Sequence, residues 1–284
     1  MDSSFRWKDE EGAGMSDDDL RGPQIGVGRT AEIFEWPGNR VLKLYVRGYS
    51  PRAVSRELHV ARAARACGVS TPNVFGEVRV DGRHGMIFER VTGPTMLALI
   101  VARKMDFAAA ASQFAELHAQ MHTRTASRLP SFSKALAFNI RRAEGLIPPL
   151  RDFALSRLAS LPSGRSVCHG DFHPDNILMS EWGPIAIDWM NGGAGDPAAD
   201  VARTFFLLAH ANVPEHMPNR AEITVLRQRF LALYLEDYCS ITGVSMSDVE
   251  AWTPVILAAR FGESVPEEHA RLTALLERSR TTDT

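Results

Sequence analysis

One eight-residue segment, His169-Gly170-Asp171-Phe172-His173-Pro174-Asp175-Asn176, limits what this chain can fold into more than any other feature. Twelve residues after Asn176, a further carboxylate, Asp188, follows the apolar residues 185–187. Phosphoryl transfer needs one carboxylate near the attacking hydroxyl, together with an amide oxygen and a second carboxylate that bind Mg²⁺ against the phosphates. Asp171, Asn176 and Asp188 supply these groups in chain order, which predicts that they form one site.

A glycine-containing segment and a lysine lie far upstream of this site. Gly26 and Gly28 fall in residues 25–34, and Lys43 stands among apolar neighbours on the next predicted strand. Glycines let a backbone approach phosphates closely, and a lysine on the following strand can reach the α and β phosphates. Two glycines alone are more typical of a structural hairpin loop, and Ala31 stands near the place of the third glycine of the protein-kinase loop.

Together these segments resemble the aminoglycoside phosphotransferase and choline kinase family, a small-molecule branch of the protein-kinase-like fold. The resemblance also includes Ile187-Asp188-Trp189, Gly195-Asp196-Pro197 and Asp200, and it covers residues 24 to 210. It implies an α+β, bilobal fold, with a five-stranded antiparallel N-lobe that has one helix and a mostly helical C-lobe. We expect a disordered tail at 1–22, a nucleotide-binding N-lobe at 23–91, and a C-lobe at 92–284 with the catalytic loop and acceptor site.

The resemblance also assigns roles to individual residues. It makes Asp171 the catalytic carboxylate, Asn176 and Asp188 the Mg²⁺ ligands, and Asp200 a support of the catalytic loop. The residues that it assigns to ATP are the glycines, the strand lysine, a helical glutamate that pairs with it, and two residues whose main chain receives the adenine: Gly26, Gly28, Lys43, Glu57, Glu89 and Val91. The alternative is a solvated glutamate beside Arg56, although Glu57 shares a helix face with Val54, Ala61 and Ala64.

Two histidine patterns allow other interpretations. His169, Asp171, His173 and Asp175 alternate in a way that could bind a hydrolase metal, but that hypothesis leaves the glycine segment, Lys43 and Glu57 unexplained. On a predicted helix that begins after Asp106, His118 and His122 are four residues apart and could share a metal. Because Ala119 stands where a zinc-protease helix has glutamate, we expect these two histidines to pack or form hydrogen bonds instead.

Composition narrows the class of partner. The formal net charge of −2 gives no electrostatic reason to expect nucleic acid or an anionic membrane surface. Cys67, Cys168 and Cys239 are isolated thiols, which suits a reducing compartment. Because no apolar run approaches the ~20 residues that cross a bilayer, we expect a cytoplasmic protein without a membrane partner. The sequence does not indicate an oligomeric state.

The segment after Asp188 favours a small acceptor. Only residues 190–197 separate the proposed metal site from the next predicted helix, which leaves no room for the activation loop of a protein kinase. We therefore expect an ATP- and Mg²⁺-dependent O-phosphotransferase that moves the γ-phosphate to a hydroxyl of a small molecule, with aminoglycosides and other antibiotics as the leading substrates. The alternatives are a metabolite kinase for choline, a sugar or a hydroxylated amine, and a nucleotide-binding regulator without catalysis.

Three further helices, at 220–239, 246–260 and 266–279, are expected to wall the acceptor pocket. From Val201 to Thr284 there are eleven acidic residues and eight arginines. That small excess does not indicate the acidic pocket that a polycationic aminoglycoside favours. Glu236, Asp237 and Glu263 are candidate contacts, although such charges more often lie on solvated helix faces.

Overall fold

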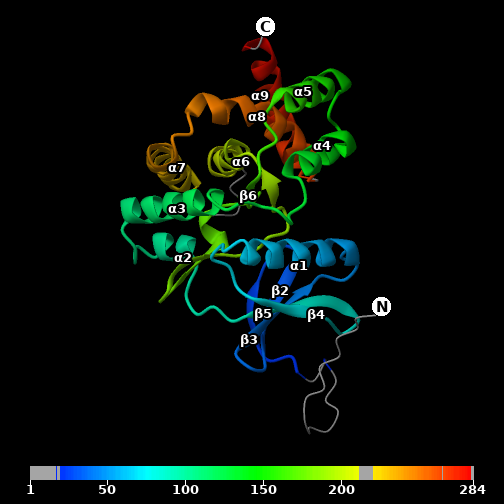
Figure 1. Ribbon diagram of the computed structural model, residues 1–284, viewed down its shortest axis with the longest axis vertical. Helices are drawn as coiled ribbons and strands as arrows, with labels where there is room; N and C mark the ends of the chain where they lie inside the picture. Colours follow the sequence, from blue (N-terminus) through cyan, green and yellow to red (C-terminus); the bar gives the residue numbers. More distant parts are fainter. Residues whose placement is uncertain (1–16, 18–19, 211–219, 264, 283–284) are drawn as a thin grey trace. The chain divides into compact units, whose positions relative to one another are not determined.

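The computed structural model describes residue 17, residues 20–210, 220–263 and 265–282 (Figure 1). The predicted tail at 1–22 lies almost wholly outside these residues. Contacts divide the chain into two units, Met1–Leu58 with Asn73–Arg90, and His59–Pro72 with Val91–Thr284. The expected boundary between the lobes, after Val91, stays a prediction, and each unit is described by itself.

The first unit is built on a five-stranded antiparallel sheet with the strand order β1-β2-β3-β5-β4. Asp81 and Gly82, both with positive φ, form the turn between β4 and β5, as the Asp-Gly pair predicts. The first half of helix α1 completes the unit. The elements are β1 Gln24–Val27, β2 Ala31–Trp36, β3 Arg40–Tyr45, β4 Val74–Val80, β5 Arg83–Glu89 and α1 Pro51–Ala66, which continues into the second unit.

Alternation along β3 gives the sheet two different buried faces. Leu42 and Leu44 belong to an apolar cluster with residues of β2, β4 and β5. Lys43 and Tyr45 point to the opposite face, where both contact Glu57 of α1. The period of two along a strand therefore places a charged residue within a buried strand without exposing it.

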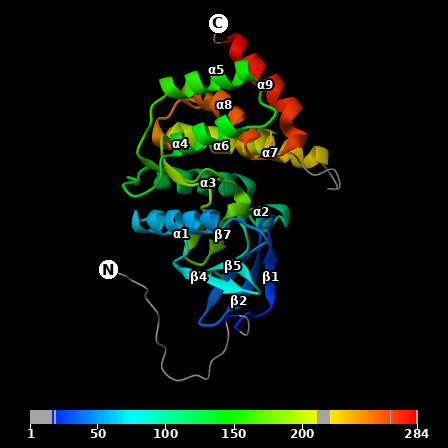
Figure 2. The ribbon, with the colours of Figure 1, turned by 90° about the vertical axis from the view of Figure 1, so that its right-hand side faces the viewer.

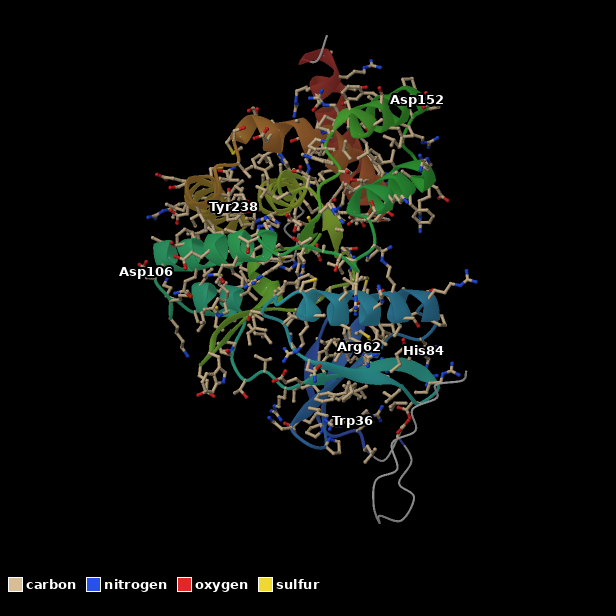
Figure 3. All side chains as sticks on the ribbon, viewed as in Figure 1. Trp36, Arg62, His84, Asp106, Asp152 and Tyr238 are labelled. Carbon is tan, nitrogen blue, oxygen red and sulfur yellow. The ribbon has the colours of Figure 1, made fainter. Side chains whose placement is uncertain are left out.

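The second unit is mostly helical. Asp106 begins α3 by accepting a hydrogen bond from the Ala109 amide at 2.9 Å, which satisfies one of the free N–H groups at the helix start (Figure 3). The buried helix α8 packs against α4, α5, α6 and α9, and α3 packs against α7 (Figure 2). The helices are α2 Met96–Val101, α3 Phe107–His122, α4 Phe132–Arg142, α5 Pro148–Ser160, α6 Pro197–His210, α7 Arg220–Thr242, α8 Met246–Phe261 and α9 His269–Thr282, with short 3-10 turns η1 Pro174–Asn176 and η2 Pro266–Glu268.

Two short antiparallel pairs lie between α5 and α6. Strands β6 Ser166–Cys168 and β9 Gly193–Gly195 pair on either side of the segment that carries the predicted site. Strands β7 Ile177–Ser180 and β8 Gly183–Ala186 form a hairpin within it. This framework fixes the backbone before and after each of the predicted catalytic residues.

The structure confirms the predicted fold class, since it has a five-stranded antiparallel sheet with one helix and a mostly helical remainder. The helices expected after Ala211 are present as α7, α8 and α9. No helix in the described part of the chain has both the length and the apolar character needed to cross a bilayer.

Candidate active site

The loop that carries Asp171 is fixed at its start by a buried carboxylate. The main-chain amides of His169 and Gly170 donate to Asp200 on α6, at 2.5 and 2.8 Å. Gly170 has φ +75°, and a Cβ at this position would lie 2.5 Å from the carbonyl oxygen of Asn191. Only glycine fits here, so the sequence His-Gly-Asp brings the chain close enough to Asp200 for both bonds.

Asp171 itself lies beside two basic side chains. Its Oδ1 is 3.7 Å from Nη2 of Arg203, and its Oδ2 is 3.9 Å from Nε2 of His173. Arg203 also donates from Nε to the Gly170 carbonyl at 3.2 Å. The Asp171 side chain retains 27% of its exposure, so it is fixed by its neighbours yet open to a ligand.

Asn176 and Asp188 are brought together at the open end of the β7–β8 hairpin. The ladder pairs Ile177 with Ala186, and just beyond it the Ile187 amide donates to the Asn176 carbonyl at 2.9 Å. The Asn176 side-chain amide donates to the Asp171 carbonyl at 2.9 Å, which leaves its Oδ1 as the atom for a cation. Amide and carboxylate oxygens are the hard ligands that Mg²⁺ prefers, so this donor set fits the metal that the sequence predicts.

Asp188 has an unusual backbone. Its φ of 66° is in the left-handed region, which a residue other than glycine adopts at a cost of about 1 kcal/mol or more. The next side chain, Trp189, is buried, and its indole Nε1 donates to Thr71 Oγ1 at 2.8 Å. The buried tryptophan therefore fixes the chain immediately after a strained carboxylate, a combination often found at functional sites.

His169 connects the two sides of the site. Its Nε2 donates to the Ile187 carbonyl at 2.9 Å, next to Asp188, and its Nδ1 accepts from the Asp171 amide at 3.3 Å. Burial lowers the pKa of this ring, so the neutral form is favoured. These bonds give His169 a supporting role in the catalytic loop, and they occupy both nitrogens of the ring.

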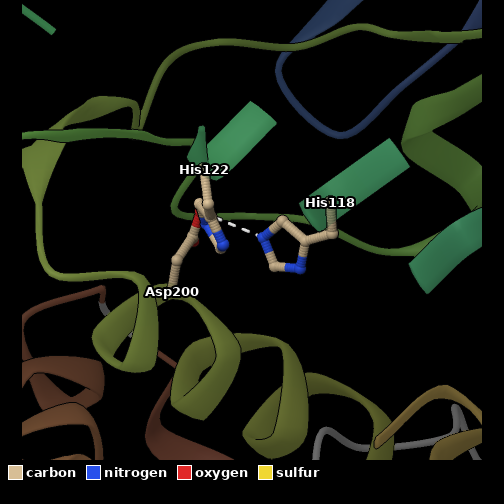
Figure 4. Close-up of side chains that lie close together, drawn as sticks. All are labelled: His118, His122 and Asp200. Atoms are coloured by element: carbon tan, nitrogen blue, oxygen red, sulfur yellow. Dashed lines mark hydrogen bonds and ion pairs between the residues drawn. The ribbon is translucent and has the colours of Figure 1, made fainter. Parts of the chain in front are cut away.

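The possible metal pair on α3 is part of a hydrogen-bond network. Nε2 of His118 and Nε2 of His122 each lie 3.2 Å from Oδ2 of Asp200 (Figure 4). The Nδ1 atoms face the hydroxyls of Tyr234 and Tyr238, at 2.8 and 2.6 Å. All four ring nitrogens therefore have a protein partner, as expected for a hydrogen-bonding role.

Within the first unit, Lys43 and Glu57 form a buried ion pair with Nζ 2.6 Å from Oε1. The second oxygen, Oε2, accepts from the Tyr45 hydroxyl at 2.6 Å. Glu57 is 1% exposed, so it is not the solvated glutamate of the alternative interpretation. The pair fixes the lysine ammonium on β3 in one place.

Of the remaining predicted nucleotide residues, Gly26, Gly28 and Glu89 lie at the edges of the first unit, and Val91 belongs to the second. Gly26 is on β1, and the Gly28 amide donates to the Ala31 carbonyl at 2.8 Å in the turn to β2. Glu89 ends β5, and its amide donates to the Asn73 carbonyl at 2.9 Å. Val91 is half-buried and is the first residue of the longer segment of the second unit.

Arg203 is the functional candidate that the sequence interpretation missed. Besides lying close to Asp171, its guanidinium forms an ion pair with Glu263 at 2.8 Å. Glu263 forms a second ion pair with Arg260 at 2.5 Å. An arginine in the mostly apolar helix α6, three residues after Asp200, is the sequence signal that could have indicated it. Glu263 is already paired with two arginines, which makes it a poor contact for a cationic acceptor.

Comparisons with known proteins agree with this geometry. The profile of the phosphotransferase enzyme family, APH, matches residues 28–241. A thermostable mutant of aminoglycoside phosphotransferase APH(4)-Ia, in its apo form, is 14% identical with a TM-score of 0.62, over 90% of this chain and 91% of that one.

Two other solved structures are similar in fold. For an aminoglycoside-3'-phosphotransferase of type VIII the identity is 18%, the TM-score 0.57, and the coverage 84% of this chain and 91% of that one. The amicoumacin kinase hAmiN, in complex with AMP-PNP, Ca²⁺ and Ami, is 13% identical with a TM-score of 0.55, over 94% of this chain and 88% of that one. No curated protein sequence matches the chain.

The family profile covers about three quarters of the chain and includes both Lys43 and the segment from His169 to Asp188. The similar structures share the fold at low identity. The chain therefore belongs to the phosphotransferase enzyme family, and it is a small-molecule phosphotransferase with a protein-kinase-like fold.

Proposed function

We propose that this enzyme transfers the γ-phosphate of ATP to a hydroxyl group of a small molecule, with Mg²⁺ as the metal. The observation that carries the proposal is the connection among Asp171, Asn176 and Asp188. One side-chain hydrogen bond joins Asn176 to Asp171, and one backbone hydrogen bond joins Asn176 to the residue before Asp188. A general base and two metal ligands are thus linked through a single residue.

Asp171 is the proposed acceptor of the substrate's proton. Its carboxylate receives a hydrogen bond from the acceptor hydroxyl and orients that oxygen toward the γ-phosphorus. As the new P–O bond forms, the bond from phosphorus to the β-phosphate oxygen breaks, ADP departs with the electron pair, and the hydroxyl proton passes to Asp171. Arg203 keeps the carboxylate from rotating away, since it contacts both Asp171 and the preceding carbonyl.

Asn176 Oδ1 and the Asp188 carboxylate are the proposed ligands of Mg²⁺. When bound, the metal would neutralise the negative charge on the phosphates. Asn176 directly precedes the first paired residue of the β7–β8 hairpin and Asp188 lies two residues after the last, so their spacing is set by a β-ladder. The strained backbone of Asp188 also supports a functional role.

Gly26, Gly28, Lys43 and Glu57 are the proposed phosphate-binding groups. A Cβ on either glycine would meet its nearest atom at 3.5 Å, which is ordinary contact, and neither has positive φ. The fold itself therefore does not require glycine at these positions. The close approach of a ligand to the backbone is the favoured explanation for the two glycines. Glu57 would hold the Lys43 ammonium in position to contact the phosphates. The main chain of Glu89 and Val91 would form hydrogen bonds with the adenine.

The proposed acceptors are hydroxylated antibiotics. Among the solved structures of similar fold, a thermostable mutant of APH(4)-Ia is in complex with AMP-PNP and hygromycin B, and hAmiN is in complex with AMP-PNP, Ca²⁺ and Ami. Metabolites such as choline, sugars and hydroxylated amines remain the second candidate class, because Glu263 is paired with Arg203 and Arg260 and so adds no free negative charge beside Asp171. A regulator without catalysis is disfavoured by the presence of Asp171, Asn176, Asp188 and Lys43 together.

The direct test measures ADP release with ATP and Mg²⁺ across aminoglycosides, other hydroxylated antibiotics, choline-like amines and sugars. We expect an acceptor-dependent signal with the wild type that falls at least 100-fold in Asp171→Asn, because the hydroxyl loses its base. Glu181→Gln, at the exposed tip of the β7–β8 hairpin, is the matched carboxylate-to-amide control and should retain full activity.

Two results would contradict the proposal. Equal turnover by the wild type and Asp171→Asn would remove Asp171 from the mechanism. Binding of ATP without ADP release for any acceptor in the panel would favour the regulator.

A further inference from the structure

Two tyrosine–histidine pairs connect α7 to the buried carboxylate beneath the catalytic loop. Tyr234 and His118 form one pair, and Tyr238 and His122 form the other, with hydroxyl-to-Nδ1 distances of 2.8 and 2.6 Å. Both rings continue through Nε2 to the same oxygen of Asp200. The tyrosines are one turn apart on α7, as are the histidines on α3, so the two pairs run side by side. Figure 3 labels Tyr238 on α7, and Figure 4 draws the two histidines with Asp200.

Because the Asp200 carboxylate can only accept hydrogen bonds, it determines which ring nitrogens of the histidines carry a proton. An ionised carboxylate only accepts hydrogen bonds, so each Nε2 that faces it must carry a proton. Burial lowers the pKa of His118 to about 3, with the charge of His122 adding to the effect, and this ring is therefore neutral at pH 7. Its Nδ1 then has a lone pair and no proton, so the hydroxyl of Tyr234 is the donor.

Asp200 accepts four hydrogen bonds in this arrangement. Oδ2 accepts from both imidazoles and from the His169 amide, and Oδ1 accepts from the Gly170 amide. The side chains of Asp200 and His118 have no exposure, so no water replaces a lost donor at either group. The orientation of each imidazole thus affects the carboxylate that positions the two residues before Asp171.

We propose that Tyr234 and Tyr238 are positioning residues for phosphoryl transfer. Each hydroxyl fixes the rotation of its histidine so that Nε2–H points at Asp200, and Asp200 in turn fixes the amides of His169 and Gly170. This inference rests on the proposed function for its kinetic consequence, whereas the proton positions can be measured without turnover.

The two pairs differ in their access to a cavity. A pocket of about 520 Å³ lies between the ends of α3 and α7, and both His122 and Tyr238 are among its lining residues, together with Ala119, Thr123 and Ile241. Neither Tyr234 nor His118 lines it. A small molecule in this pocket can therefore reach the position of the Tyr238 ring but not that of Tyr234.

The first experiment detects the imidazole protons by ¹H–¹⁵N NMR of protein labelled at histidine. In the wild type we expect pyrrole-type Nε2–H signals from His118 and His122, shifted downfield by the carboxylate and slow to exchange with water. Tyr238→Phe should accelerate exchange and shift the Nδ1 signal of His122 only, and Tyr234→Phe should do so for His118. Phe230→Leu is the control, because Phe230 packs on the same helix against Phe114 without a polar group and should change neither signal.

The second experiment uses kinetics and chemical rescue. In each Tyr→Phe variant we expect kcat to fall about tenfold, the effect of one lost hydrogen bond at the catalytic loop, while KM for ATP stays within twofold. In Tyr238→Ala, added phenol should restore part of the lost kcat through the pocket, whereas toluene, which has the same shape without a hydroxyl, should not. The equivalent Tyr234→Ala variant should not respond to phenol.

The proposal is overturned if the NMR signals of both histidines in the Tyr→Phe variants match the wild type, or if the wild type carries its proton on Nδ1 of His118. It is also overturned if kcat in both Tyr→Phe variants stays within twofold of the wild type, or if toluene restores Tyr238→Ala as well as phenol does. Loss of turnover in the wild type itself would instead count against the proposed function, because the NMR result does not depend on an acceptor.

Discussion

At the scale of single residues, burial and hydrogen bonding determine the charge state of the Asp200 network. Burial lowers the pKa of His118 to about 3, and the nearby charge of His122 acts in the same direction. Burial alone would raise the pKa of Asp200, but the hydrogen bonds from His118 and His122 bring it well below its ordinary value. Asp200 is therefore a charged acceptor whose two carboxylate oxygens are held by hydrogen-bond donors, which is the arrangement that keeps a buried carboxylate stable.

The charge state of His118 predicts a dependence of stability on pH. Below about pH 6.5 the unfolded chain protonates this histidine, whereas the folded protein does so only near pH 3, so the unfolded state binds more protons and stability falls as pH falls. Between pH 7 and pH 5 this residue should cost about 2 kcal/mol of unfolding free energy. Urea unfolding at both values, for the wild type and His118→Gln, measures the difference. A variant with the same loss as the wild type would contradict the assignment.

At the scale of elements, a chain of ion pairs joins α6 to the end of α8 and to η2. Arg203 on α6 pairs with Glu263, Glu263 pairs with Arg260 on α8, and Arg260 pairs with Glu268 of η2 at 2.7 Å. The pKa of Glu263 is lowered: burial opposes ionisation, but the charges of Arg203 and Arg260 outweigh it. Because Arg203 also contacts Asp171, this chain connects the packing of the last helices to the catalytic loop.

Glu263 is the member of this chain whose loss should be most costly. Glu263→Ala leaves two mostly buried guanidinium groups facing each other, and we expect about 3 kcal/mol of destabilisation in urea unfolding. The matched control is Glu267→Ala on the exposed face of η2, which should change stability by less than about 0.5 kcal/mol. Equal effects of the two substitutions would show that the chain of ion pairs contributes nothing specific.

At the scale of the whole molecule, local signals predicted most of the helices and strands, whereas contacts between residues far apart in the chain could not be predicted from the sequence. The Asp81-Gly82 turn and the Asp106 cap act within four residues, so both were predictable. Helices α4 and α5 were missed although Ser131 caps the first and Pro148 begins the second. The contact between Arg203 and Glu263 joins residues 60 positions apart and depends on how α6 packs against α8, which no short pattern encodes. The Lys43–Glu57 pair was expected from the family resemblance alone.

The proposed roles of Lys43, Asp171 and Asp188 predict which substitutions weaken the stabilisation of the fold by ATP and Mg²⁺. At 100 times its dissociation constant, MgATP should raise the unfolding free energy of the wild type by about 2.7 kcal/mol. Lys43→Met removes a phosphate contact and should reduce the gain with ATP alone as well as with MgATP, whereas Asp188→Asn weakens a metal ligand and should reduce only the part that Mg²⁺ adds. Asp171→Asn should keep the full gain, since its proposed contact is with the acceptor. Thermal unfolding of the four proteins, with ATP, Mg²⁺ or both, separates these contributions. If Asp171→Asn lost as much as Asp188→Asn, the division between base and metal ligand would be wrong.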